Sequence, residues 1–337
     1  MSSAIIFPAQ PENILKGLGK LWTSLGQEEK QQGKPTVLRA CAMTLIVATD
    51  EPDSGFTASQ TISELMHSHP ARGIVLAVSP EAEKSLQARV LAQCWKPFGK
   101  AQQICCEQIE ITARPQSWPH VGPTLIGLTV ADLPVIFWCR HKGALSQAAT
   151  SDEQAGLEAV TDLATKVVID TRGMPAADAT SLLERWQARG RVIADLEWTR
   201  LTPWREPLAH VFDVCDIKLA DFHSIDIEYT DDRPSMAALY MGGWLSLYGA
   251  KVSFRRAAGY LPGVHRVTLR SDSKTIDFAR TGPDSAVLRS AGGRECTYNF
   301  GEPAVTALMT EELALMGVDP AFNGAFGRVR GLLPDTP

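Results

Sequence analysis

Apolar, strand-like runs alternate with amphipathic helical segments along most of this chain. A run from Val37 to Thr49 is followed by a helical pattern over Thr57–Ser68 and then by the branched run Gly73–Val78. Strands separated by helices in this way predict βαβ units, in which consecutive strands run parallel in one sheet. The alternation therefore predicts an α/β fold.

The same rhythm continues through both halves of the chain. Apolar residues at 86, 90, 91 and 94 are spaced as on one face of a helix, and the run Gln103–Ala113 is rich in branched residues that favour a strand. Between residues 121 and 262, strand-like runs again alternate with helical patterns, and Thr202-Pro203 predicts the start of a helix. The apolar stretch 121–139 is about long enough to span a membrane, but an internal aspartate and two prolines favour two buried segments joined by a turn.

After Gly263 the pattern changes to short alternating segments separated by Ser, Asp and Gly, which predict an antiparallel meander. A helix from Val305 to Met316 follows, and the tail from Asn323 is expected to be loosely ordered. We therefore predict an α/β protein with two mostly parallel α/β halves, helices on the sheet faces, and a small C-terminal antiparallel β unit. The predicted segments are 1–35 (an N-terminal amphipathic helix), 36–120 (the first α/β half), 121–262 (the second α/β half) and 263–337 (the meander with a closing helix).

Charge and cysteine content exclude several classes of protein. The chain has 337 residues with 33 Lys and Arg against 38 Asp and Glu, and this net charge of -5 offers no general attraction for nucleic acid or for an anionic membrane surface. Seven cysteines, an odd number, are spread over a long chain, unlike the disulfide framework of a small secreted domain. The amino terminus lacks the basic and apolar regions of a signal peptide. A cytoplasmic protein with no nucleic-acid or membrane partner is expected.

The motifs of the commonest nucleotide sites and hydrolases are absent. Gly17 and Gly19 would need a third glycine where Trp22 stands, so the dinucleotide fingerprint fails, and no phosphate loop is complete. Neither a nucleophile elbow nor a zinc-protease motif occurs. His67 and His69 are two residues apart and would point to different faces of a helix, so they are not expected to share a metal. The sequence therefore predicts no catalytic residue, no cofactor and no metal.

Cys105 and Cys106 are adjacent within the predicted strand Gln103–Ala113. Successive residues of a strand point to opposite faces, so a bond between these two thiols would need a strained ring. We expect one thiol to pack in the core and the other to face solvent or a partner. The alternative, a redox role, requires exposure and a lowered pKa, and the neighbouring Glu107 carboxylate would raise a thiol pKa instead.

Tryptophan and arginine are concentrated in Trp198–Glu206, at the predicted junction of a strand with a helix. Ligands of α/β sheets bind at such junctions, and helix amino termini attract anions. Two further arginines lie beside predicted strand ends, and three arginines that met at one rim would hold a phosphate or a carboxylate. In the structural alternative the tryptophans close the top of the sheet and an arginine pairs with Glu206 or Asp195. The candidate partner- or anion-binding residues are Arg72, Arg140, Trp204 and Arg205.

Four short motifs occur in order between about residues 36 and 210. They are His69-Pro70-Ala71-Arg72, Cys105-Cys106-Glu107-Gln108-Ile109, Asp132-Leu133-Pro134-Val135 leading to Trp138 and Arg140, and Leu201-Thr202-Pro203-Trp204-Arg205-Glu206. Together they resemble the OpcA family, the glucose-6-phosphate dehydrogenase assembly proteins. The resemblance implies a cytoplasmic, non-catalytic protein that associates with glucose-6-phosphate dehydrogenase and promotes its assembly or activity.

Three hypotheses stand side by side at this point. The leading one is a binding module that acts as an assembly factor or allosteric activator of glucose-6-phosphate dehydrogenase in the oxidative pentose phosphate pathway. The alternative is an α/β protein, or an enzyme, that binds a sugar phosphate or another anion through Arg72, Arg140 and Arg205, which must then meet in one pocket. The third is a thiol-based sensor at Cys105 or Cys106.

Overall fold

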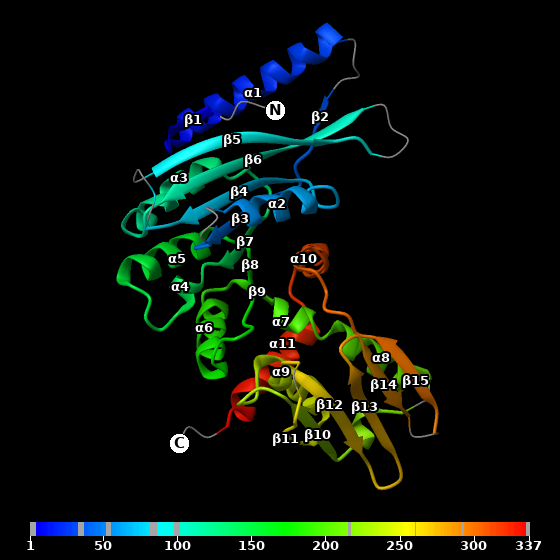
Figure 1. Cartoon of the computed structure of the whole chain (residues 1–337). Helices are drawn as coiled ribbons and strands as arrows, with labels where there is room; N and C mark the ends of the chain where they lie inside the picture. The colour runs from blue at the N-terminus through cyan, green and yellow to red at the C-terminus, as the bar shows by residue number, and fades with distance from the viewer. Residues whose placement is uncertain are drawn as a thin grey trace. The chain divides into compact units, whose positions relative to one another are not determined.

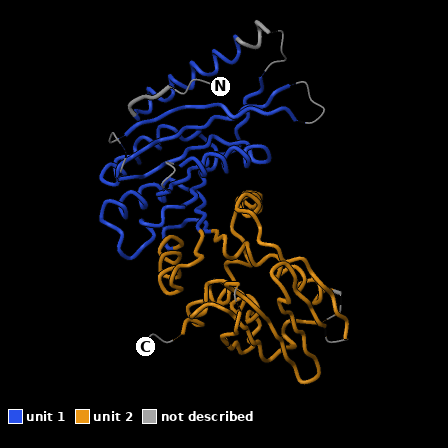
Figure 2. The backbone as a smooth tube through the Cα atoms, viewed as in Figure 1, with its two compact units in different colours: residues 1–169, 188–193 blue, residues 170–187, 194–337 orange. Residues whose placement is uncertain are grey.

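The computed structural model describes residues 5–32, 37–51, 55–80, 82, 86–97, 102–214, 217–259, 261–290 and 293–334. The chain divides into two compact units, residues 1–169 with 188–193 and residues 170–187 with 194–337 (Figure 2). The first unit contains a mostly parallel sheet, here called sheet A, and the second contains a mixed sheet, here called sheet B (Figure 1).

Sheet A has the strand order β1-β5-β6-β4-β3-β7-β8-β9, and β2 pairs with β6. Strands β6, β4, β3, β7 and β8 run parallel, whereas β5 is antiparallel to both β1 and β6. The strands are Ile5–Pro8 (β1), Val37–Arg39 (β2), Met43–Thr49 (β3), Ala71–Val78 (β4), Leu86–Trp95 (β5), Gln103–Ala113 (β6), Val135–Arg140 (β7), Lys166–Ile169 (β8) and Val192–Asp195 (β9), of which Val192 and Ile193 belong to the first unit.

Helices cover sheet A, and every residue of β3 and β4 is buried. Strands that are covered on both faces are apolar throughout instead of alternating. The approach of α2 to β4 is close at Gly73, where a Cβ atom would lie 2.6 Å from Cγ2 of Ile62. The helices of this unit are Pro11–Gln32 (α1), Phe56–Leu65 (α2), Pro115–His120 (η1), Val121–Leu128 (α3), Lys142–Leu145 (α4) and Ser151–Leu163 (α5).

The helix predicted from residues 86, 90, 91 and 94 is wrong, because this segment is strand β5. Residues 86, 90 and 94 are four apart, and this even spacing also keeps them on one face of a strand, the face on which the buried residues Ala88 and Val90 lie. The antiparallel partner β6 supplies the backbone hydrogen bonds along the whole segment. Pairing with β6, which follows later in the chain, therefore decides that this segment is a strand and not a helix.

Sheet B has the strand order β11-β10-β12-β13-β14-β15. The predicted meander is confirmed, because β12 to β15 pair antiparallel in sequence order. Strand β10, expected to complete the parallel part, lies in sheet B instead, parallel to β11 and antiparallel to β12. The strands are Ser224–Tyr229 (β10), Lys251–Arg256 (β11), Val264–Arg270 (β12), Thr275–Gly282 (β13), Ser285–Arg289 (β14) and Glu295–Asn299 (β15).

Two helices of the second unit, α8 (Thr202–Val214) and α9 (Met236–Leu245), pack on one face of sheet B. The tail from Asn323, expected to be loosely ordered, is instead part of α11, whose Phe322 and Phe326 are buried. Gly243 of α9 permits this packing, because a Cβ there would lie 2.3 Å from the carbonyl oxygen of Ala325. The helices are Ala176–Ala188 (α6), Leu196–Thr199 (α7), Thr202–Val214 (α8), Leu219–Asp221 (η2), Met236–Leu245 (α9), Ser246–Tyr248 (η3), Val305–Ala314 (α10), Pro320–Val329 (α11) and Arg330–Leu332 (η4).

The α/β class, the mostly parallel sheet with helices on its faces and the C-terminal antiparallel strands are confirmed. Sheet A joins strands of both predicted halves, since β3 of the first pairs with β7 of the second. The segment boundaries at 35, 120 and 262 stay predictions. Among the residues that the structure describes, no helix combines the length and the apolar character needed to cross a membrane.

Candidate functional site

The order β6-β4-β3-β7-β8 places the topological switch point of sheet A between β3 and β7. Chain connections leave these two strands toward opposite sides, and ligands of open parallel sheets bind in the crevice at the carboxyl ends of such strands. Asp50 and Glu51 follow β3 at this point, and Arg140 ends β7 with His141 behind it. The predicted candidate Arg140 therefore lies where a ligand site is expected.

The polar groups at this switch point bind one another. Arg140 forms an ion pair with Glu51, and its guanidinium lies 4.9 Å from the ring centre of Trp138. Asp50 Oδ2 accepts a hydrogen bond of 2.8 Å from the amide of Gly143. The backbone donor and the arginine that an anion would use are thus already engaged by two carboxylates of the chain.

His141 beside this cluster is a neutral, structural side chain. Its Nδ1 accepts a 2.9 Å hydrogen bond from the amide of Ala144, so the ring proton is on Nε2. Burial lowers the pKa of His141, against the opposing effect of Asp50. The ring stacks on Trp118 at 4.5 Å. A proton-transfer role is not supported by this geometry.

Arg72 does not meet Arg140. Strand β3 pairs through Thr44 with Arg72 and through Thr49 with Arg140, so the two arginines lie at opposite ends of the parallel strands. These two arginines therefore do not meet at one rim, which was the condition for a shared anion site, because residue 72 begins a strand and residue 140 ends one. Arg205 belongs to the other unit.

Arg72 is instead held in the interior of the first unit. Its Nε donates to Glu107 at 2.7 Å and its Nη1 donates to the carbonyl of Leu128 at 2.7 Å. Glu107, whose side chain is 4% exposed, also accepts from Trp22 and from Arg39, each at 2.6 Å. Three donors satisfy one buried carboxylate, the condition under which a buried charge is stable.

Both cysteines of the adjacent pair are buried, so the expectation that one faces solvent is wrong. Sheet A is covered on both faces, and both directions from β6 lead into packed side chains. Cys105 forms a disulfide with Cys94, its register partner on β5. Burial raises the pKa of the Cys106 thiol to about 11, and Cys106 Sγ lies 3.3 Å from the carbonyl of Ala40.

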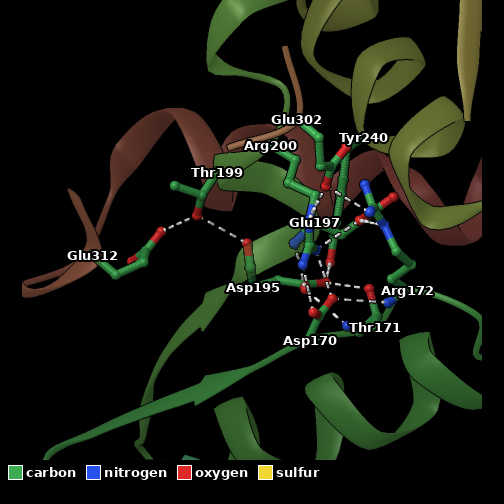
Figure 3. A network of polar contacts seen from close by, with 10 residues as sticks. All are labelled: Asp170, Thr171, Arg172, Asp195, Glu197, Thr199, Arg200, Tyr240, Glu302 and Glu312. Carbon is green, nitrogen blue, oxygen red and sulfur yellow. Dashed lines mark hydrogen bonds and ion pairs between the residues drawn. The ribbon is translucent and has the colours of Figure 1, made fainter. Parts of the chain in front are cut away.

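In the second unit, Asp195 ends β9 and is completely buried (Figure 3). Its Oδ1 accepts from the amides of Thr171 and Glu197 at 3.1 and 3.0 Å, and its Oδ2 faces the hydroxyls of Thr171 and Tyr240 at 2.5 and 2.6 Å. Burial raises the pKa of Asp195 to about 7, against the effect of these hydrogen bonds. Either hydroxyl can donate or accept, so the cluster accommodates the carboxyl group with or without its proton.

A second set of charges surrounds Arg200, as Figure 3 shows. Arg200 donates to both oxygens of Asp170 at 2.7 and 2.6 Å and to Glu197 at 3.0 Å. Arg172 contacts the same Glu197 at 3.2 Å and Glu302 at 2.7 Å. Burial raises the pKa of Glu197, and the two arginines oppose that rise. These side chains form a network of ion pairs that ties Asp170 and Glu197 to the chain around residue 302.

The sequence contains a signal for this network outside the motifs named above. Two of the strand-like runs between residues 121 and 262, KVVID (166–170) and RVIAD (191–195), end in an aspartate, Asp170 and Asp195. The carboxyl ends of neighbouring parallel strands lie at the same edge of a sheet, so two terminal aspartates indicate a polar cluster there. Nothing in the local sequence points to Tyr240 or Glu302, which lie 45 and more residues further on.

The predicted helix start at Thr202-Pro203 is confirmed as the first turn of α8. The Arg205 guanidinium lies 3.9 Å above the ring of Trp198 and donates to Thr202 Oγ1 at 2.8 Å. Burial lowers the pKa of Arg205, against the opposing effect of nearby carboxylates. Trp198 in turn donates to Asp319 at 2.9 Å. The arginine packs on an aromatic ring, and no ion pair to Glu206 or Asp195 is described for it.

Trp204 lies in the core of the second unit. Its side chain is 3% exposed, and its ring meets those of Phe278 and Phe300 edge to face at 4.8 Å. A direct contact of Trp204 with a partner is therefore not available in this conformation. The ring fixes α8 on sheet B instead.

A groove of about 420 Å³ lies beside the start of α8. Its polar groups include Glu206 and His210 from the helix and Tyr298 from β15, with two prolines in its wall. The hydroxyl of Thr202 at its edge is already bonded to Glu311 at 2.7 Å. Within the described ranges, no group of three or more His, Cys, Asp or Glu side chains is placed to hold a metal ion. The lining residues are Thr202, Pro203, Glu206, Pro207, His210, Tyr298 and Asn299.

Curated relatives of this chain are OpcA proteins that are assigned by name to the OxPP cycle. The chain is 27% identical to OpcA of Synechocystis sp. over 271 residues, which is 75% of this chain and 53% of the relative. It is 28% identical to OpcA of Nostoc punctiforme over 206 residues, 58% of this chain and 42% of the relative. The chain thus spans about half the length of these relatives.

Solved structures share the general arrangement at a low level. A levoglucosan dehydrogenase in complex with NADH and levoglucosan superimposes with a TM-score of 0.47 at 11% identity, over 87% of this chain and 95% of that one. An oxidoreductase from Sinorhizobium meliloti gives a TM-score of 0.45 at 10% identity, over 88% and 96%. At these values neither likeness bears on function.

Two family models match consecutive parts of the chain. The N-terminal domain of the glucose-6-phosphate dehydrogenase subunit, OpcA_G6PD_assem, matches residues 62–188. The C-terminal domain of that subunit, OpcA_G6PD_C, matches residues 191–326. Because these two matches together cover most of its length in the expected order, the chain belongs to the OpcA family.

Proposed function

We propose that this chain is a non-catalytic protein that binds glucose-6-phosphate dehydrogenase in the cytoplasm and promotes its assembly or activity. The observation that carries the proposal is the pair of matches to the two domains of a glucose-6-phosphate dehydrogenase subunit. The names of the relatives, which refer to the OxPP cycle, support the same pathway.

The chemistry of the switch point supports a partner role over a dehydrogenase role. A dinucleotide at the first βα turn of such a sheet is held by free backbone N–H groups next to its pyrophosphate. Here Asp50 and Glu51 follow β3, and two carboxylates would repel a pyrophosphate. The hydride transfer is therefore assigned to the partner enzyme.

An anion-binding function has less support. Such a site needs several free cationic groups that converge. Arg72 is bound to Glu107, and Arg140 is bound to Glu51 at the other end of the strands. Arg205 is stacked on Trp198. Each of the three candidate arginines is thus used within its own unit.

Activation of a partner requires higher affinity for its active conformation or oligomer than for the inactive one. A coupling of about 1–3 kcal/mol would change the activity of the dehydrogenase 5- to 150-fold. The size of the effect therefore measures how strongly this chain distinguishes the two states.

The test is a titration of the purified chain into the cognate glucose-6-phosphate dehydrogenase, with initial rates measured at several glucose 6-phosphate concentrations. We expect a higher maximal rate or a lower KM, and no turnover by the chain alone. An unrelated protein at the same concentration controls for crowding. The proposal is lost if rate and KM are both unchanged while light scattering detects no complex.

A further inference from the structure

Sheet B has one covered face and one open face. On the inner face, Trp204 of α8 packs on Phe278, and Gly242 of α9 lies so close to β11 that a Cβ there would be 2.9 Å from Phe254. The residues between these inward positions point the other way. We call the opposite surface the outer face of sheet B.

The outer face is charged and open to water. The exposed fractions of its arginine side chains are 69% for Arg255, 41% for Arg266, 46% for Arg270 and 49% for Arg289. Between them lie smaller side chains that the long arginines shield, such as Val287. A face of this kind, formed by six described strands, is available for contact with another molecule.

The charges of the outer face form stripes that alternate in sign from strand to strand. The charged residues that any one strand places on the outer face have one sign, and those of each neighbouring strand have the opposite sign; Arg280 of β13 points to the inner face, where it lies over Phe300. In the order of the sheet the stripes are Lys251 and Arg255 on β11, Asp226 and Glu228 on β10, Arg266 and Arg270 on β12, Asp277 on β13, Arg289 on β14, and Glu295 on β15.

Contacts between neighbouring stripes confirm that these side chains share one face. Arg255 pairs with Glu228, and Arg270 pairs with Asp226. On the other side of the sheet centre, Arg289 lies 3.6 Å from Asp277 and 2.9 Å from Glu295. Arg266 reaches Asp277 at 3.5 Å and so joins the two halves of the pattern.

An even number of alternating stripes is complementary to itself. A two-fold axis that runs along the strands, between β12 and β13, places β12 over β13 of a second copy, β10 over β14 and β11 over β15. Every positive stripe then faces a negative one. An axis across the strands would instead place each stripe over itself, with like charges opposed.

We propose that the outer face of sheet B is the contact surface of a symmetric dimer of this chain, with the two-fold axis parallel to the strands between β12 and β13. In a two-fold interface the same patch is used by both copies and each contact occurs twice. Opposite potentials across an interface fix its register and exclude wrong partners. The stripes meet this requirement in one orientation.

The strand register identifies the contacts in this dimer. Asp226, Thr268, Asp277, Arg289 and Glu295 are consecutive register partners and lie at one level across the sheet. The axis therefore brings Asp226 of one copy opposite Arg289 of the other, and Thr268 opposite Asp277.

The outer face is also large enough for a stable interface. Six strands about 4.8 Å apart and roughly 20 Å long have a projected area on the order of 500–600 Å². Side-chain relief raises that area toward the roughly 800 Å² per partner of a stable interface.

The first experiment measures the mass of the purified full chain by sedimentation equilibrium at increasing salt. We expect the mass of two chains at low ionic strength and about tenfold weaker association at high ionic strength, because salt screens charges at an exposed interface. A monomer at every concentration and salt level would overturn the proposal. This measurement needs no variant and is independent of the dehydrogenase.

The second experiment exchanges the charges of one predicted contact. Asp226→Arg and Arg289→Asp each place like charges opposite each other twice in the dimer, so each single variant is expected to dissociate at least tenfold more readily. The double variant restores opposite charges in both contacts and is expected to regain association. Glu64→Arg on α2, an exposed charge outside sheet B, is the matched control for a change of two charges.

Melting temperatures of the four variants show whether each is folded. The proposed surface is refuted if both single variants dimerise as strongly as the wild type. It is also refuted if the double variant dimerises as weakly as the single variants. Activation of glucose-6-phosphate dehydrogenase is measured on the same preparations. If the wild-type chain is a monomer and the single variants lose activation, the outer face binds the dehydrogenase and the dimer is refuted. If a variant no longer dimerises but still activates the dehydrogenase, the proposed function is unaffected.

Discussion

Sheet A buries an ion pair in its interior, whereas sheet B carries its ion pairs on an exposed face. In sheet A the charge of Arg72 is enclosed and bound to Glu107, on strands whose residues are buried on both faces. In sheet B the charges of Arg255 and its neighbours lie on one open face, while the other face carries the core. We therefore expect the buried pair of Arg72 and Glu107 to contribute to stability, and the charges on the outer face of sheet B to contribute to the proposed contact between two copies.

The strongest test of this difference is Arg72→Met. Removing one partner of a buried ion pair leaves the other charge poorly compensated, and we expect a loss of about 3–5 kcal/mol in the free energy of unfolding. The matched control is Arg39→Ala, which removes a half-exposed partner of the same carboxylate and should cost less than about 1 kcal/mol. Urea unfolding of both variants measures the difference, and equal losses would contradict the assignment of Arg72 as a buried structural residue.

Asp195, at the end of the last strand of sheet A, adds a pH dependence. Its pKa is raised from 3.8 to about 7 in the folded state, so the folded protein binds more protons than the unfolded chain between these values. Stability should therefore fall as pH rises from about 4 to 7 and level off above that, by roughly 4 kcal/mol for this group.

Asp195→Asn removes this titration while retaining the shape of the side chain. The stability of the variant relative to the wild type should rise as pH increases from 5 to 8. Melting curves at matched pH values check this. A difference between the two proteins that does not change with pH would show that Asp195 is ionised throughout.

Cysteines of the two sheets should differ in reactivity. The thiolate is the reactive form, and burial raises the pKa of Cys106 in sheet A to about 11, whereas Cys296 of sheet B is exposed. We expect iodoacetamide to modify Cys296 roughly a hundredfold faster than Cys106 in the native protein, as measured by peptide mass spectrometry. Equal rates in the folded protein, with both sites reactive in denaturant, would favour the thiol-sensor hypothesis.

Substitution of Arg205 tests the structural role of the segment Trp198–Glu206, which contains the start of α8. Arg205→Ala removes its packing on Trp198 and its hydrogen bond to Thr202, and we expect a loss of about 1–3 kcal/mol. That corresponds to roughly 2–4 °C in melting temperature per kcal/mol, with activation of the dehydrogenase retained. Arg205→Lys, which keeps the charge but not the planar group, should fall between. A normal melting temperature with lost activation would instead make Arg205 a binding residue.

The smallest effect is expected on the outer face of sheet B. Arg255→Ala removes an exposed partner of Glu228, and such ion pairs contribute between 0 and about 1 kcal/mol. Thermal unfolding at low protein concentration, where the monomer dominates, measures it. A loss as large as that of Arg72→Met would show that the two sheets do not differ in how they use charge.

Local patterns predicted most elements but not their partners. The βαβ alternation, the strand of Cys105 and the helix start at Thr202 follow from residues that are close in the sequence, and these predictions are confirmed. The predictions for the segment Leu86–Trp95 and for the tail from Asn323 are wrong. In both cases a distant element, β6 or α9, supplies the pairing or packing that local periodicity does not contain.

The candidate site shows the same division. The sequence indicated arginines near strand ends, and Arg140 does lie at the switch point. The predicted strands place Arg72 at a strand start and Arg140 at a strand end, and in a parallel sheet these positions lie at opposite ends, as the structure shows. The partners of each arginine lie 35 and 89 residues away in the sequence.

By itself, the sequence determined the α/β class, the β-rich C-terminal part and membership of the OpcA family, because periodicity and short motifs are properties of neighbouring residues. The tertiary structure alone decided the disulfide of Cys94 with Cys105, the burial of Trp204 and the alternating stripes of sheet B. Each of these depends on the order in which strands associate. Strand order is set by the free energy of the whole packed sheet, which no local segment encodes.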